Sequence, residues 1–133
     1  MTYVADTHAF VWYQTGQHRR LGRAAHRVFR RVVAGRDQLR LPAISLFEVA
    51  ILVERGRLRS PLTWGAWLAA ARATRGFGVE PMGLDDVDLA RDMVLLADPF
   101  DRLVVATARR LDAPLLTSDD RIASSGLVDV VWA

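Results

Sequence analysis

The chain has 133 residues, of which 51% are hydrophobic and none is cysteine. This composition predicts one folded domain over residues 1–133 and argues against disorder, disulfide frameworks and thiolate metal sites. No apolar run approaches the roughly 20 residues of a membrane span, and no basic segment precedes an apolar one as in a signal peptide. We therefore expect a cytoplasmic protein.

Charge is distributed unevenly along the chain, although the net charge is only +3. Residues 1–75 contain 13 Arg against 4 acidic residues, and residues 76–133 contain 5 Arg against 11. All 18 basic residues are Arg, whose planar fork suits phosphate. An Arg-rich segment at 19–40 is commonly just a solvated helix face, but its density favours a polyanionic partner.

The hydrophobic pattern of the first half predicts two strands and four helices. We expect the strands at residues 2–6 and 39–41, and the helices at residues 7–13, 21–34, 45–55 and 64–74. Gly35 is expected to end the second helix as a C-cap glycine. Ser45 and Glu48 have the spacing of a capping box, which predicts that the third helix begins at Ser45.

The second half continues the alternation. We expect strands at residues 77–82, 114–117 and 128–132, and helices at residues 85–96, 99–111 and 121–124. Asp98 would cap the helix that has Pro99 at its first position. Strands that alternate with helices predict a single-domain α/β/α sandwich with a central parallel sheet of four or five strands.

Four acidic residues stand where an expected strand ends or a helix begins: Asp6, Glu48, Asp101 and Asp119. Taken singly, each has an ordinary explanation as a helix cap, a capping-box residue or a turn residue. In a parallel sheet, however, these positions share one edge, where ligands of open α/β sheets bind. Carboxylates that lie close together repel one another, which raises their pKa values, and a bound divalent cation offsets this repulsion.

Hard oxygen ligands suit Mg²⁺ or Mn²⁺, and the three histidines lack the spacing of a zinc site. A carboxylate-bound cation beside arginines is typical of phosphodiester chemistry. Two positions leave alternatives open: Asp120 competes with Asp119, and Asp98 stands one turn before Asp101. His8 lies two residues after Asp6 and could touch a substrate.

The chain resembles a PIN-domain ribonuclease of the VapC type, from the toxin–antitoxin pairs called VapBC. Four motifs carry the resemblance in the family's order: residues 4–8 (VADTH), 42–50 (PAISLFEVA), 98–108 (DPFDRLVVATA) and 115–119 (LLTSD). Each motif is weak by itself, but four in order along nearly the whole chain are specific.

The resemblance implies an endoribonuclease toxin that depends on Mg²⁺ or Mn²⁺. Water would attack phosphorus and leave 5′-phosphate and 3′-hydroxyl ends. The metal would be carried by Asp6, Glu48, Asp101 and Asp119, with Thr117 steadying Asp119. The resemblance also implies an RNA substrate, for which the family offers transfer RNA as a candidate, a VapB-type antitoxin in the active-site groove, and a homodimer.

Two other functions compete with the nuclease. The first is a non-catalytic RNA- or partner-binding module whose acids are only caps. The second is another metal-dependent phosphoryl hydrolase, although His8 stands where a phosphatase would have a second Asp. Large aromatic residues, Trp12, Trp64 and Trp67, are expected mostly in the core, with at least one at an interface.

Overall fold

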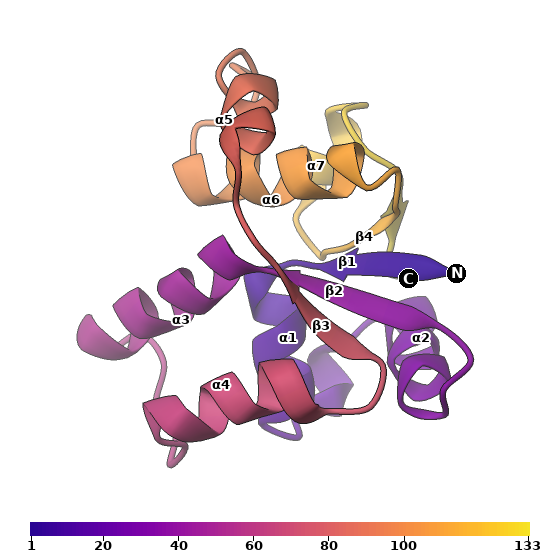
Figure 1. The fold of residues 1–133 in the computed structure, drawn as a ribbon, viewed down its shortest axis with the longest axis vertical. Coiled ribbons are helices and arrows are strands. Elements are labelled where there is room, and N and C mark those ends of the chain that lie inside the picture. The colour runs from indigo at the N-terminus through magenta and orange to yellow at the C-terminus, as the bar shows by residue number, and fades with distance from the viewer.

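The central sheet has five strands, all parallel, in a computed structural model that describes all residues 1–133 (Figure 1). The strands are β1 Thr2–Ala5, β2 Gln38–Pro42, β3 Phe77–Glu80, β4 Leu115–Leu116 and β5 Val130–Val131. Their spatial order is β3-β2-β1-β4-β5, so the chain winds outward from the centre first in one direction and then in the other. The reversal occurs between β1 and β4, which makes their carboxyl ends a topological switch point.

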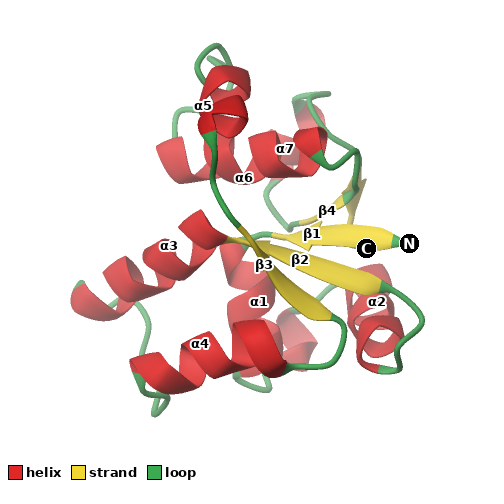
Figure 2. Cartoon of the chain, in the orientation of Figure 1, coloured by secondary structure: helices red, strands yellow, loops and turns green.

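Helices cover both faces of the sheet, as the sequence predicted (Figure 2). They are α1 Thr7–Gln14, α2 Arg23–Val33, α3 Ala43–Glu54, α4 Trp64–Ala73, α5 Leu84–Ala90, α6 Pro99–Arg110 and α7 Asp120–Ser124, with a short 3₁₀ helix, η1, at His18–Arg20. Successive residues of β1 face opposite layers. Val4 packs with the core beneath α6, and Ala5 packs with the core around α1 and α2.

One predicted helix start is wrong. Helix α3 begins at Ala43 and not at Ser45, because the chain passes directly from strand β2 into the helix at Pro42. Ser45 is the third residue of the helix. Its side chain is fully buried, and its Oγ has no hydrogen-bond partner. Ser45 and Glu48 therefore form no capping box, and Glu48 is available for another contact.

One predicted helix is too long. The expected helix at 85–96 ends at Ala90, and the chain continues as tight turns in which Met93 bonds to Ala90 and Leu96 bonds to Met93. This spacing of three buries Met93 and Leu96 but leaves Val94 and Leu95 76% and 69% exposed. The apolar pattern thus correctly predicted the burial of Ala90, Met93 and Leu96, but it was wrong about Val94 and about a continuous helix.

Three other local predictions agree with the structure. Asp98 accepts a hydrogen bond from Phe100 N at the start of α6, with Pro99 at the first position. Gly35 follows Ala34, the C-cap residue of α2, and has a φ of +80°. Trp67 is buried in the core, whereas Trp64 is 47% exposed.

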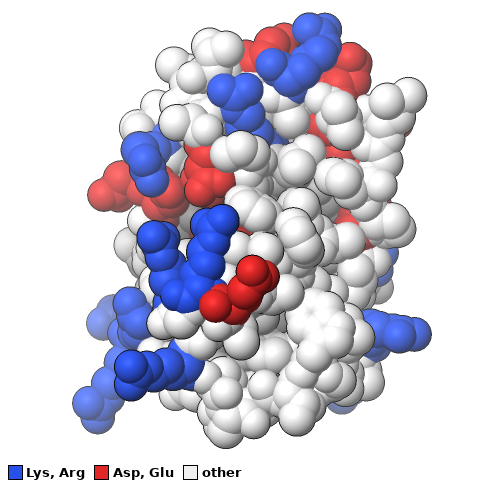
Figure 3. Space-filling view, turned by 90° about the vertical axis from the view of Figure 1, so that its left-hand side faces the viewer, with Lys and Arg blue, Asp and Glu red and all other residues white.

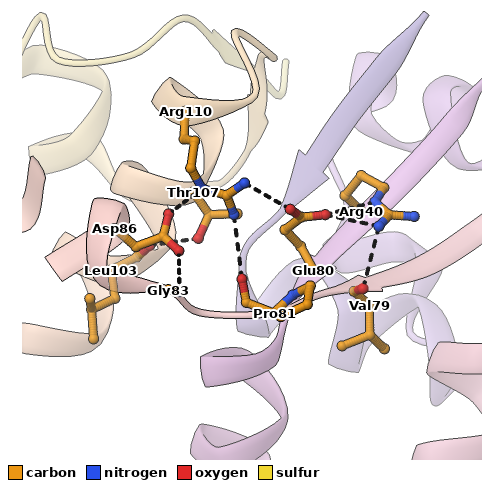
Figure 4. A network of polar contacts seen from close by, with 9 residues as sticks. All are labelled: Arg40, Val79, Glu80, Pro81, Gly83, Asp86, Leu103, Thr107 and Arg110. Atoms are coloured by element: carbon orange, nitrogen blue, oxygen red, sulfur yellow. Dashed lines mark hydrogen bonds and ion pairs between the residues drawn. The ribbon is translucent and has the colours of Figure 1, made fainter.

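A polar network joins the sheet edge to α5 and α6 (Figure 4). Arg110 donates to the buried Asp86 at 2.6 Å and to Glu80 at 2.8 Å, and Arg40 donates to Glu80 at 2.8 Å. Burial acts to raise the pKa of Glu80, but the two guanidinium groups hold this pKa below its ordinary value. The network fixes the segment between β3 and α5, because Asp86 also accepts from Gly83 N.

Candidate metal centre

Two of the predicted acids follow neighbouring strands. Asp6 comes directly after β1, and Asp119 comes shortly after β4. Both side chains cap helices: Asp6 accepts from Ala9 N at 2.8 Å, and Asp119 accepts from Arg121 N at 2.8 Å. The capping explanation is therefore correct for both residues, and it does not compete with a role in binding, since each carboxylate also faces the same hollow.

The other two acids come from helices. Glu48 lies on the second turn of α3, where its Oε1 accepts a 2.6 Å hydrogen bond from the buried hydroxyl of Thr7. Asp101 lies in the first turn of α6. Because α1 begins with Thr7 at the switch point, the Thr7–Glu48 bond fixes α3 relative to the end of β1.

All four predicted acids line one hollow of about 220 Å³. Its lining residues are Asp6, Thr7, His8, Glu48, Asp98, Asp101, Val104, Ser118, Asp119 and Arg121. Asp98 joins the hollow as well as capping α6, whereas Asp120 lies outside it and is exposed. Of the two aspartates between which the sequence left the choice open, Asp119 lines the hollow and Asp120 does not.

Crowding of negative charge is visible in the pKa of Asp101, which is raised to about 7. Partial burial is the largest cause, followed by repulsion from Asp98, Asp119, Glu48 and Asp6. Burial also raises the pKa of Asp6, against the lowering effect of a hydrogen bond from the Thr117 side chain. In Figure 3, the acidic side chains on this face lie mostly in its upper half, and arginine side chains lie below them.

The donor chemistry of the hollow fits a hard divalent cation such as Mg²⁺ or Mn²⁺, because carboxylate oxygens predominate and cysteine is absent. As the side chains stand, no three Asp, Glu or His residues converge tightly enough to enclose a metal ion. The hollow therefore suits a divalent cation in its negative charge and in the type of its ligand atoms. Arg121 is the only Arg that lines the hollow, so positive charge supplied by the protein offsets little of the repulsion.

The arginine-rich segment is divided by the fold. Arg27, Arg30, Arg31 and Arg36 surround a separate hollow on α2. Arg31 pairs with Asp37, which also binds the N-terminal amine of Met1. This group lies where β1 and β2 begin, at the edge of the sheet opposite to the acids. Arg20, by contrast, lies in a hollow that also includes His8.

Three features of the site were not predicted. Thr7, Ser118 and Arg121 line the hollow, and Thr7 orients Glu48. Their positions next to Asp6 and Asp119 were the available signal, but adjacency alone does not reveal where a side chain points. Thr117, expected to steady Asp119, accepts a hydrogen bond from the Asp119 backbone N at 3.1 Å.

The fold and the hollow define a doubly wound parallel α/β protein with an acidic site at its switch point. Residues 3–126 match the family model of the PIN domain. Ribonuclease VapC22 of Mycobacterium tuberculosis is 32% identical over 124 residues, which cover 92% of this chain and 91% of that protein. The chain therefore belongs to the PIN-domain family and, within it, to the VapC type.

Solved structures support the same fold. VapBC2 from Rickettsia felis, bound to a promoter DNA fragment, matches with a TM-score of 0.71 and 12% identity over 100% of both chains. Mycobacterium tuberculosis VapC20, described as a sarcin-ricin loop cleaving toxin, matches with a TM-score of 0.65 and 17% identity over 98% of this chain and 99% of that one. At such low identity, these likenesses concern the fold alone.

Proposed function

We propose that the chain is the toxin of a VapBC pair, a single PIN domain over residues 1–133 that cleaves RNA with the help of Mg²⁺ or Mn²⁺. Asp6, Glu48, Asp101 and Asp119 would carry the metal, directly or through water. The observation that carries this proposal is the shared hollow, in which repulsion among carboxylates contributes to raising the pKa of Asp101 to about 7. The likeness to Ribonuclease VapC22 supports RNA as the substrate.

Two threonines position the carboxylates of the proposed metal site. Thr7 holds Glu48 against the hollow, and Thr117 bonds to the backbone of Asp119 and to the side chain of Asp6. These contacts fix the carboxylates before substrate arrives, which reduces the reorganisation needed for reaction. A bound divalent cation would activate water and stabilise charge on the phosphate oxygens.

The same carboxylates make the hollow repel RNA when no cation is present. A phosphate group would meet five acidic side chains, Asp98 included, and a single arginine. Divalent cation and RNA backbone are therefore expected to bind cooperatively at this hollow, because each neutralises charge that opposes the other.

We further propose a VapB-type antitoxin as partner, which the VapBC2 complex among the structural neighbours supports. Phe47 is 55% exposed beside Glu48, and its ring lies 6.2 Å from that of Phe100 at the start of α6. An antitoxin seated on this apolar edge would cover the acidic hollow. A homodimer is also proposed, for which Leu84, Val94 and Leu95 offer exposed apolar surface. None of the helices is both long and apolar enough to cross a bilayer.

The decisive experiment is incubation of the purified protein with a mixed RNA pool in Mg²⁺, in Mn²⁺ and in chelator. Metal-dependent cleavage is expected, with Asp101→Asn inactive. Asp120→Asn is the matched control, because Asp120 is exposed, adjacent to Asp119 and outside the hollow. Undiminished cleavage by Asp101→Asn would refute the assignment of the site. Binding of RNA without cleavage in any metal would favour the non-catalytic module instead.

A further inference from the structure

A second, smaller hollow lies beside the acidic one. It measures about 180 Å³ and is lined by His8, Val11, Trp12, Gln17, Arg20, Leu52, Arg57 and Leu58. It is contributed by α1, by η1 with the residue before it, and by the C-terminal end of α3 with the segment that follows. His8 lines both hollows, so the two adjoin at the first turn of α1.

The two hollows follow the same pair of helices. On α1, His8 and Trp12 are four residues apart, and on α3, Glu48 and Leu52 are four residues apart. Residues at this spacing lie on one face of a helix, about 5.4 Å apart along its axis. Since His8 and Glu48 line the acidic hollow while Trp12 and Leu52 line the second, the groove continues by one helical turn away from the acids.

The second hollow contains two arginines, Arg20 and Arg57, and no acidic residue. Neither arginine takes part in any ion pair of the structure. The guanidinium carbon of Arg20 lies 4.5 Å from the centre of the Trp12 ring, and its only hydrogen bond is a long one of 3.5 Å to Gln17. The ring therefore restricts Arg20 while most of its N–H donors remain free for a ligand.

Charge along the groove thus changes sign, from carboxylates that favour a cation to guanidinium groups that favour an anion. An isolated exposed arginine is ordinary, but here two arginines without an ion-pair partner line one hollow, which shares His8 with the acidic hollow. Arginine binds phosphate oxygens through pairs of N–H groups. The small volume, between two packed helices, suits one strand of nucleic acid and not a duplex.

From this arrangement we infer that the hollow of Arg20 and Arg57 binds the phosphodiester backbone of single-stranded RNA, next to the bond that is cleaved in the acidic hollow. The inference rests on the proposed ribonuclease function. Through the two arginines, the protein would hold the substrate strand on one side of the reacting phosphate and align that strand with the groove between α1 and α3.

The test is equilibrium binding of a fluorescently labelled single-stranded RNA oligonucleotide, measured by anisotropy in chelator so that no cleavage occurs. The measurement starts at low salt, where binding is strongest, and the repulsion from the acidic hollow is the same in every arginine variant. Each of Arg20→Gln and Arg57→Gln is expected to raise Kd about tenfold, as for loss of a charged hydrogen bond. Each change should also reduce the slope of log Kd against log salt by roughly 0.7, the value for one phosphate contact on a single strand.

Arg27→Gln and Arg30→Gln are the matched controls, because they remove the same charge at the opposite edge of the sheet. Thermal unfolding of every variant checks that it is folded; Arg57 is exposed and follows the end of α3, so its replacement leaves the core intact. An unchanged Kd in Arg57→Gln, or an equal loss in the controls, would overturn the inference.

RNA binding tests the backbone site, and RNA cleavage tests the proposed nuclease, so the two proposals can fail independently. Loss of affinity in Arg57→Gln, together with a wild-type protein that cuts no RNA in Mg²⁺ or Mn²⁺, would retain the backbone site and refute the nuclease. Cleavage by the wild type, together with unaltered affinity in both hollow variants, would retain the nuclease and refute the backbone site.

Discussion

The hydroxyl of Thr7 donates a 2.6 Å hydrogen bond to Oε1 of Glu48 and so joins the first turn of α1 to α3 at the rim of the acidic hollow. Thr7 is only 2% exposed, and the two residues are 41 positions apart in the chain. The bond removes freedom from Glu48 without neutralising its charge. Two separate elements thereby present their groups to one site.

Replacing Thr7 by valine should test this role. Thr7→Val keeps the shape of the side chain but removes the donor, which is expected to lower the free energy of unfolding by about 1.5 kcal/mol. RNA cleavage should also fall, because Glu48 is no longer held in place. Thr7→Ser retains the hydroxyl and is the control. Urea unfolding and cleavage rates measure the two effects, and equal behaviour of the two variants would show that the bond is unimportant.

Asp101 should make stability depend on pH in the absence of metal. Its folded-state pKa of about 7 exceeds the ordinary value of 3.8, so the unfolded chain loses this proton first. Stability is therefore unaffected by Asp101 below pH 4 and declines as the pH rises from about 4 to 7.

Asp101→Asn should remove this decline. At pH 8 in chelator, the variant is expected to be more stable than the wild type by about 1 to 2 kcal/mol, a value reduced for solvent screening of a partly exposed group. At pH 4 the two proteins should unfold at the same temperature. Calorimetric or circular-dichroism melts at both pH values provide the measurement. A variant less stable than the wild type at pH 8 would contradict the crowding of charge.

Divalent cations should stabilise the wild-type protein. At a concentration 100 times Kd, Mg²⁺ or Mn²⁺ is expected to add about 2.7 kcal/mol to the free energy of unfolding. The gain should be smaller at pH 5.5 than at pH 8, because protons compete for Asp101, and it should be lost in Asp101→Asn. Asp120→Asn should retain it. A melting temperature that does not change with either metal would argue against a metal site in this hollow.

The network of Arg110 should be a principal support of the fold around α5. Arg110→Met leaves Asp86, whose side chain is 0% exposed, without its guanidinium partner, and should cost about 3 kcal/mol of stability. Arg91→Met is the control, because Arg91 pairs with Asp88 at side-chain exposures of 65% and 71% and should change stability by less than about 0.5 kcal/mol. Denaturant unfolding compares the two. Similar small losses would mean that Asp86 finds another partner.

The sequence predicted more of the site than of its supporting contacts. Acidic residues that follow strands, such as Asp6 and Asp119, were predictable because the carboxyl ends of parallel strands share one edge. Glu48 was correctly expected near the carboxyl edge of the sheet, but the predicted capping box between Ser45 and Glu48 does not form. The true partner is Thr7, and a bond between residues so far apart leaves no trace in local spacing.

The arginines show the same limit. Their density between residues 19 and 40 is a property of the sequence, and it predicted a face for a polyanion. Only the tertiary structure separates these arginines. Arg27 and Arg30 lie at the edge of the sheet opposite the acids, whereas Arg20 lies over the Trp12 ring and lines the same hollow as Arg57. Arg20 and Arg57 line the same hollow because η1 follows α1 and Arg57 follows α3, so their proximity depends on how α1 and α3 pack in the core.

By itself, then, the sequence determined the alternation of strands and helices, the parallel sheet and the acidic residues at the carboxyl edge of the sheet, because periodicity and capping are local properties of the chain. The tertiary structure alone decided which carboxylates share a hollow, that Asp119 rather than Asp120 enters it, and where unpaired positive charge adjoins it. Those outcomes depend on side-chain direction and on distances between elements remote in sequence, which are fixed only when the layers pack together.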